Sequence, residues 1–145
     1  MATETILLPL DGSEHSKYAC EVAYKLAALI PGEETMHLLH CVAPIPGLIG
    51  GEQRGQLEKD HAKEAEEIFA PCIELFSKLG NPCVTHIVYG DPGECIASAA
   101  EEFGCTMIIM GCRGRSDLKN LVLGSASSNV LQKSKVPVLI AKPTK

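Results

Sequence analysis

The chain has 145 residues, a formal net charge of −5 and only three Tyr, three Phe and no Trp. This length suits one domain with one hydrophobic core, so residues 1–145 are predicted to form one unit. An acidic chain with few aromatic rings lacks the surfaces that bind nucleic acid. No apolar run approaches the roughly 20 residues that a membrane-spanning helix needs, and the start has an acidic residue where a signal peptide has basic ones, which predicts a cytoplasmic protein without a membrane partner.

Apolar runs alternate with segments of helical periodicity along the whole chain. The apolar runs are near-continuous, which is typical of strands buried on both faces of a sheet. Strict alternation of five strands and four helices predicts an α/β fold with an open, doubly wound parallel sheet, since five strands are too few to close an eight-stranded barrel. The predicted strands span 5–10, 35–42, 84–89, 106–110 and 136–141, and the predicted helices span 14–30, 54–79, 94–103 and 124–134.

Local signals mark several helix ends. In the stretch "DPGE", Asp91 is predicted to be the N-cap, Pro92 the first helical residue and Glu94 the partner that closes a capping box. Gly80 is predicted to stop the preceding helix, and Pro71 inside that helix is predicted to kink or split it.

The seven cysteines are odd in number and include no C-x-x-C pair. Several lie in apolar patterns, where a free cysteine packs as a small hydrophobic side chain. This usage predicts a reducing compartment and no zinc site.

Two strand-to-helix loops are longer than the usual 2 to 6 residues or so. They are residues 43–53 and the stretch from 111 to 124, whereas the helix-to-strand connections are short. Because strand-to-helix loops of a parallel sheet meet at its carboxyl edge, where ligands bind, the extra chain predicts a site at that edge.

The second long loop carries the features of a phosphate site. Gly111, Gly114 and Gly124 permit close backbone approach, and Ser125 opens a helix whose N-terminal N–H groups attract anions. Arg113 adds positive charge, although neither a P-loop nor a G-x-G-x-x-G motif occurs. In the alternative interpretation, the glycines only make a turn and the serine only caps the helix.

Asp11 follows the first strand at the same edge and is a candidate ligand for Mg²⁺. The alternative is a helix-capping role, either in a box with Glu14 or beside Ser13 as the N-cap. Asp11 and Gly111 face one cleft only if the first and fourth strands are neighbours.

No nucleophile is paired with a base in the sequence. His15 follows Asp11 closely enough to approach the cleft or to lie on a helix surface, and the other histidines are assigned to packing or surface positions. Cys112 lies in the glycine-rich loop with only Arg113 nearby to lower its pKa. Efficient covalent catalysis is therefore not predicted, and the chain is not expected to be an enzyme beyond a weak ATPase.

Together, "LPLDGSEHS" after the first strand and G-x2-G-x9-G-S before the last helix resemble the universal stress protein family, in its nucleotide-binding branch, over residues 6–141. The resemblance implies the adenine nucleotide alpha hydrolase-like fold, with strand order 3-2-1-4-5 and ATP between strands one and four. It places Pro9, Leu10 and Asp11 beneath the nucleotide, Val42 near the adenine, Met110 and Gly111 beside the ribose, and Arg113, Gly114, Gly124, Ser125 and Ala126 around the phosphates.

Cys112 departs from the family pattern, which often has a small hydroxyl residue there, and the motifs do not distinguish ATP from ADP or AMP. The function expected from the resemblance is an ATP-binding regulatory protein of the stress response, with Mg²⁺ at Asp11 and slow or no hydrolysis. The alternatives are a dimeric interaction module that needs no nucleotide and, by analogy of fold alone, an adenylating or transferring enzyme.

The last predicted strand, residues 136–141, is an edge in the implied strand order. It is short, apolar and rich in β-branched residues, so it is predicted to pair with its own copy in a homodimer. In the alternative interpretation, Pro137 and the flanking Lys135 and Lys142 keep this edge unpaired.

Overall fold

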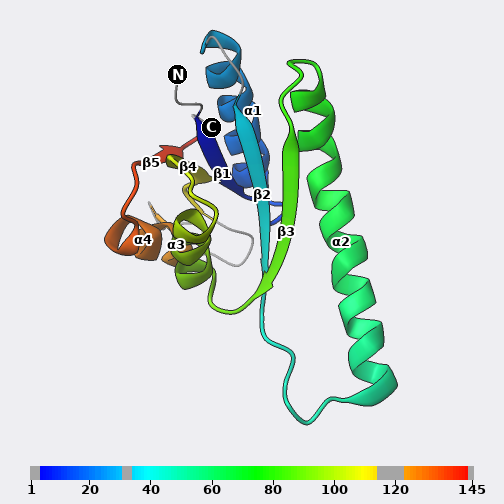
Figure 1. Cartoon of the computed structure of the whole chain (residues 1–145). Helices are drawn as coiled ribbons and strands as arrows, with labels where there is room; N and C mark the ends of the chain where they lie inside the picture. The colour runs from blue at the N-terminus through cyan, green and yellow to red at the C-terminus, as the bar shows by residue number, and fades with distance from the viewer. Residues whose placement is uncertain (1–3, 31–33, 114–122, 144–145) are drawn as a thin grey trace.

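A five-stranded, all-parallel sheet with the order β3-β2-β1-β4-β5 forms the centre of the protein (Figure 1). The computed structural model describes residues 4–30, 34–113 and 123–143. Strand and helix alternate as predicted, and the strand order that the resemblance implied is confirmed. The elements are β1 (Thr5–Pro9), α1 (Glu14–Leu29), β2 (Thr35–Val42), α2 (Gly51–Ser77), β3 (Cys83–Tyr89), α3 (Pro92–Glu102), β4 (Met107–Gly111), α4 (Ser125–Lys133) and β5 (Val138–Ala141).

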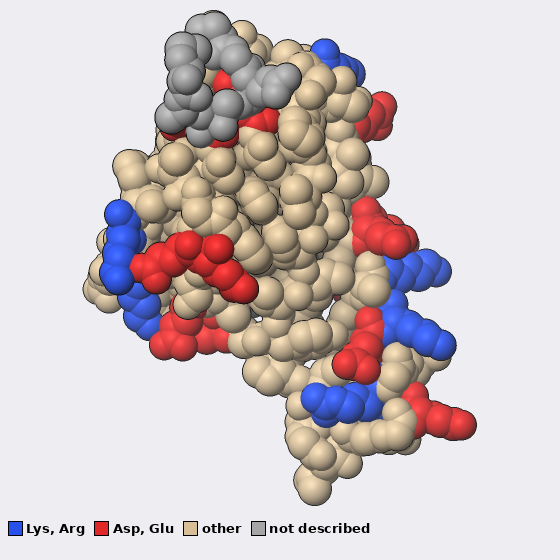
Figure 2. All heavy atoms as spheres, in the orientation of Figure 1, with Lys and Arg blue, Asp and Glu red and all other residues tan. Residues whose placement is uncertain are grey.

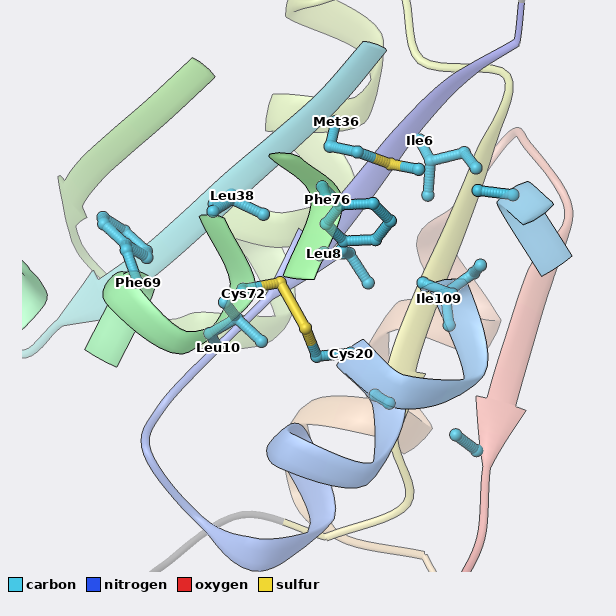
Figure 3. Packing of buried hydrophobic residues seen from close by; sticks show 14 of the residues in the cluster. Ile6, Leu8, Leu10, Cys20, Met36, Leu38, Phe69, Cys72, Phe76 and Ile109 are labelled. Carbon is cyan, nitrogen blue, oxygen red and sulfur yellow. A yellow bond between two sulfur atoms is a disulfide. The ribbon is translucent and has the colours of Figure 1, made fainter. Parts of the chain in front are cut away.

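Helices cover both faces of the sheet because neighbouring strand residues point to opposite sides. Ile6 and Leu8 of β1 pack with residues of α1 and α2, whereas Leu7 packs with residues of α3 and α4. All three side chains are completely buried. Figure 3 shows the core on the side of α1 and α2, where Phe76 of α2 lies close to Leu8.

Most of the predicted helix ends are confirmed. Asp91 is the N-cap of α3 and accepts a hydrogen bond from the N–H of Glu94, while Pro92 begins the helix. The prediction that Glu94 closes a capping box is wrong, because its carboxylate pairs with Lys133 of α4 at 2.8 Å instead, and this contact joins the two helices. Gly80 follows α2 with a φ of 74°, which a side chain would disfavour.

The prediction for Pro71 is wrong with respect to splitting, because α2 is one helix that contains it. Proline inside a helix costs about 3 kcal/mol through its missing N–H and the clash of its ring with the preceding turn. The residues around it offset that cost, since Phe69, Cys72 and Phe76 are all buried in the core. Tertiary packing thus overrides the local signal.

One pair of cysteines departs from the prediction that cysteines in apolar patterns pack as free thiols. Cys20 of α1 and Cys72 of α2 form a disulfide in the core between these two helices (Figure 3). The sequence could not show this pair, because the two residues are 52 positions apart and lie in unrelated helical patterns. Cys41, Cys83, Cys95, Cys105 and Cys112 are free.

Charge is mixed on the visible surface. On the face in Figure 2, Lys and Arg side chains lie next to Asp and Glu, and this face has no broad basic patch. Exposed pairs such as Lys135 with Glu101, at 3.0 Å, are of this kind. No helix in the described part of the chain is long and apolar enough to cross a bilayer.

Candidate functional site

A cleft opens at the carboxyl ends of β1 and β4. These two strands are neighbours, and the chain leaves them toward opposite faces of the sheet, β1 into α1 and β4 toward α4. Such a switch point is where open α/β sheets bind ligands. The empty space in the cleft is about 690 Å³, a volume that includes space open to solvent. It is lined by Pro9, Leu10, Asp11, Ser16, Leu39, Cys41, Pro92, Ile96, Met110, Gly111, Arg113, Ser125, Ala126 and Ser127.

The structure brings most of the predicted site residues together in this cleft. Those that line it are Pro9, Leu10 and Asp11 after β1, Met110, Gly111 and Arg113 around the end of β4, and Ser125 and Ala126 at the start of α4.

Three predicted residues are not among the lining residues. Val42 ends β2, but its neighbour Cys41 lines the cleft instead, because adjacent strand residues point to opposite faces. Gly124 is the N-cap of α4 and precedes the lining residues Ser125 and Ala126. Gly114 lies outside the described residues.

Hydrogen bonds from Gly124 and Ser127 fix the N-terminus of α4 to the end of β4. Gly124 is the N-cap and Ser125 is the first helical residue, which corrects the interpretation of Ser125 as a cap. The N–H of Gly124 and the hydroxyl of Ser127 both donate to the carbonyl of Cys112, at 2.7 and 2.8 Å. These two bonds join the start of the long loop to its end.

Asp11 lies on the opposite wall and orders the start of α1. Its Oδ1 accepts a hydrogen bond from the N–H of Ser13 at 2.9 Å, and Ser13 is the N-cap that accepts from the N–H of Ser16. Of the two capping alternatives, the one with Ser13 is confirmed, while Glu14 pairs with Lys17 and closes no box. Asp11 therefore lines the cleft and holds the adjacent turn at the same time.

Gly111 has a role that the sequence did not predict. A Cβ at this position would lie 2.8 Å from the backbone carbonyl carbon and oxygen of His15. The missing side chain lets the first turn of α1 pack directly against the end of β4. The glycine thus closes the wall of the cleft, whether or not it also approaches a ligand.

His15 joins the two sides of the cleft at their rim. Its Nδ1 lies 3.0 Å from Sγ of Cys112, and its Nε2 lies 3.3 Å from a guanidinium nitrogen of Arg113. Both partners are nearly 100 positions away in the sequence. The sequence left His15 open between the cleft and the surface, and no signal paired it with these residues.

Comparison with known proteins agrees with this geometry. The sequence pattern of the Universal stress protein family matches residues 2–142. The chain belongs to this family. A universal stress protein of Thermus aquaticus, encoded in the QAH/OAS sulfhydrylase 3' region, is 32% identical over 139 residues, which are 96% of this chain and 98% of that protein.

Solved structures of the family share the fold. The structure of MJ0577, from Methanocaldococcus jannaschii, has a TM-score of 0.83 with 29% identity and covers 100% of this chain and 99% of its own. A universal stress protein in complex with cAMP has a TM-score of 0.72 with 23% identity, over 97% of each chain. The cleft of the present family member lies at the switch point of this shared sheet.

The other histidines of this universal stress protein lie apart from the cleft lining. His37 and His86 are 2.8 Å apart and stack with Phe103, and burial lowers the pKa of both imidazoles. His40 is buried, and its Nδ1 bonds the carbonyl of Leu10 at 2.9 Å, which fixes the end of the first strand below the cleft. These histidines were predicted at packing or surface positions, and their contacts place His37, His40 and His86 among packed residues.

Cys41 is the cysteine that lines the cleft. Burial, with a smaller effect of the nearby Cys95, raises the pKa of its thiol to about 12. The thiol is therefore neutral near pH 7 and is a poor nucleophile. It contributes apolar surface to the wall, beside Leu39 and Ile96.

Proposed function

We propose that the cleft binds an adenine nucleotide, ATP or its products ADP and AMP, and that the protein is a nucleotide-dependent regulator. The observation that carries this proposal is that one cleft is lined by Asp11, by Gly111 and Arg113, and by the start of α4, whose N-cap is a glycine. A family neighbour with bound cAMP supports the ligand class.

The phosphates fit the end of the cleft at α4. The first turn of this helix has N–H groups without partners inside the helix, and the helix dipole favours negative charge there. Arg113 lines the same end and can only donate hydrogen bonds, which suits phosphate oxygens. Gly114, in the same loop, stays a predicted phosphate contact.

The base and ribose fit the other end. Leu39, Ile96 and Met110 give an apolar wall for a purine ring, and Gly111 follows Met110 beside the expected position of the ribose. Val42 is the last residue of β2 and does not line the cleft, whereas the preceding residue, Cys41, does. We therefore assign the contact with adenine to Cys41.

A magnesium ion at Asp11 belongs to this proposal as well. Within the described residues, no group of three or more His, Cys, Asp or Glu side chains is arranged to hold a metal. An ion at Asp11 would therefore take most of its ligands from phosphate oxygens and water, as Mg²⁺ commonly does beside nucleotides.

We expect hydrolysis to be slow or absent. Cys112 and His15 have the spacing of a nucleophile and a base, but the thiol is 1% exposed. A guanidinium cannot accept a hydrogen bond, so contact with Arg113 puts the proton of a neutral His15 on Nδ1, facing the thiol. In that tautomer the imidazole cannot take the proton of Cys112. A steady-state ATPase rate above about 1 s⁻¹ would contradict this expectation.

Calorimetric titration with ATP and Mg²⁺ tests the proposal. We expect saturable heat for the wild-type protein and none for Gly124→Val, because the valine side chain blocks the approach of phosphate to the first turn of α4. The backbone at Gly124 has a φ of −77° and a ψ of 173°, which valine also adopts, so the fold should persist. Gly55→Val, on α2 with no atom within 4 Å of an added Cβ, is the matched control.

The second candidate is an interaction module that needs no nucleotide. It would be favoured if wild-type protein gave no heat and no thermal stabilisation with millimolar ATP. Normal binding by Gly124→Val would instead show that the phosphates lie elsewhere.

We further propose a homodimer through β5 and a cytoplasmic location.

A further inference from the structure

Three side chains form a row at the rim of the cleft. The guanidinium of Arg113 is 3.3 Å from Nε2 of His15, and Nδ1 of the same imidazole is 3.0 Å from Sγ of Cys112. The imidazole comes from the first turn of α1, whereas the other two groups follow β4 directly. His15 thus connects the α1 wall of the cleft to the arginine that follows β4.

The direction of the hydrogen bonds in this row is fixed by chemistry. A guanidinium has five N–H donors and no acceptor, so Nε2 of His15 must accept. In the neutral imidazole Nδ1 then carries the proton and donates to the sulfur of Cys112. Both ring nitrogens are satisfied in one orientation of the ring.

The row is also anchored at the level of the backbone. The close approach of Gly111 to the carbonyl of His15 fixes the distance between α1 and β4. The carbonyl of Cys112 is held by the N–H of Gly124 and the hydroxyl of Ser127. These backbone contacts fix the position of the imidazole. Its bond to Arg113 then restricts the conformations of that long side chain.

We propose that His15 is a positioning residue that holds the guanidinium of Arg113 at the phosphate end of the cleft. This inference rests on the proposed nucleotide function. A long side chain that is ordered before binding loses less entropy when a ligand arrives. His15 thereby sets the preference of the site for phosphorylated nucleosides over the bare nucleoside.

Two variants separate the two bonds of the imidazole. In His15→Gln the side-chain amide reaches the position of Nε2 and keeps an acceptor for Arg113. In His15→Asn the shorter amide reaches only the position of Nδ1, next to Cys112. We expect His15→Asn to weaken binding of Mg²⁺ and ATP by up to about tenfold, because the guanidinium of Arg113 is then less ordered before binding. We expect His15→Gln to keep the wild-type affinity.

The experiment is calorimetric titration with two probes, ATP with Mg²⁺ and adenosine, on the wild-type protein and on both variants, repeated in an Arg113→Ala background. Adenosine affinity should be the same in all proteins, because adenosine carries no phosphate. In the Arg113→Ala background, His15→Asn should have no further effect on ATP, since the imidazole acts only through the guanidinium. If His15→Asn does not fold, the test uses the other variants. In that case His15→Gln should bind ATP as tightly as wild type, whereas Arg113→Ala should bind it more weakly.

Other results overturn the inference. The role of His15 is merely structural if His15→Asn weakens the binding of ATP and of adenosine equally. The same follows if His15→Asn weakens ATP binding just as much in the Arg113→Ala background, or if His15→Gln does not restore ATP binding. If the wild-type protein binds both probes and one of these results appears, only the inference fails. If it binds neither probe, the proposed function fails and takes the inference with it.

Discussion

Gly111 shows how a single missing side chain shapes the cleft. We expect Gly111→Ala to lower the free energy of unfolding by about 1–3 kcal/mol, the range for overpacking a buried site. The new methyl group would lie 2.8 Å from the backbone of His15, and backbone cannot move aside as a flexible side chain can. Urea denaturation followed by circular dichroism measures the change.

Gly55→Ala is the control for this substitution. Gly55 lies inside α2 with open space around it, so alanine there should raise stability by about 0.5–1 kcal/mol through helix propensity. A Gly111→Ala protein that is as stable as wild type but no longer binds ATP would contradict the packing role. It would instead support the sequence-based interpretation, in which the glycine makes room for a ligand.

At the scale of elements, the disulfide connects the two helices on one face of the sheet. The buried residues of α2 are Ala65, Phe69, Cys72 and Phe76, all in its C-terminal half. The N-terminal end of this helix and the loop before it project beyond the sheet (Figure 1). Cys72 therefore anchors α2 to α1 within the segment that reaches the core.

We expect Cys20→Ala/Cys72→Ala to lower the free energy of unfolding by about 2–5 kcal/mol, because the cross-link closes a long loop in the unfolded chain. Urea titrations with and without dithiothreitol measure this difference. The wild-type midpoint should fall in the reductant, and the double variant, as the control, should not respond. An unchanged wild-type midpoint, with two free thiols at these positions by mass spectrometry, would refute the expectation.

The disulfide also bears on location. Disulfides are rare in cytosolic proteins of most organisms, where thiols are kept reduced. The cytoplasmic location stays a proposal, and it requires that the buried Cys20–Cys72 bond stays oxidised in the cytoplasm.

At the scale of the whole molecule, β5 is an edge that pairs only with β4 among the described strands. The strand begins at Val138, two residues later than predicted, so Pro137 precedes it and removes no donor from it. Val138, Leu139 and Ile140 are only partly buried, which leaves apolar surface at this edge. The structure thereby strengthens the argument for pairing.

We expect a homodimer through β5, with light scattering near twice the chain mass of 15.5 kDa. Val138→Lys should shift the protein toward the monomer, because two lysines would face each other across the two-fold axis. Val84→Lys, on the opposite edge strand β3, is the matched control and should leave the mass unchanged. A wild-type protein that stays monomeric at high micromolar concentration would favour the interpretation in which Lys135 and Lys142 protect the edge.

Much of the cleft was predictable because its residues are defined by positions along the chain. A residue that follows a parallel strand lies at the carboxyl edge of the sheet, so Asp11 and Gly111 were placed there by sequence alone. Their meeting in one cleft depends on β1 and β4 being neighbours, and that order came from the family resemblance. Val42 stays a predicted contact with adenine, although Cys41 lines the cleft in its place, because adjacent strand residues point to opposite faces.

Periodicity and end signals are local properties, and the sequence by itself determined the element order, the parallel sheet and the capping role of Asp91. Only the tertiary structure decided the contacts between residues far apart in the chain. It joined Cys20 to Cys72, kept α2 intact at Pro71 and brought His15 to Arg113. Such contacts depend on the distance and orientation of packed elements, which no short stretch of sequence records.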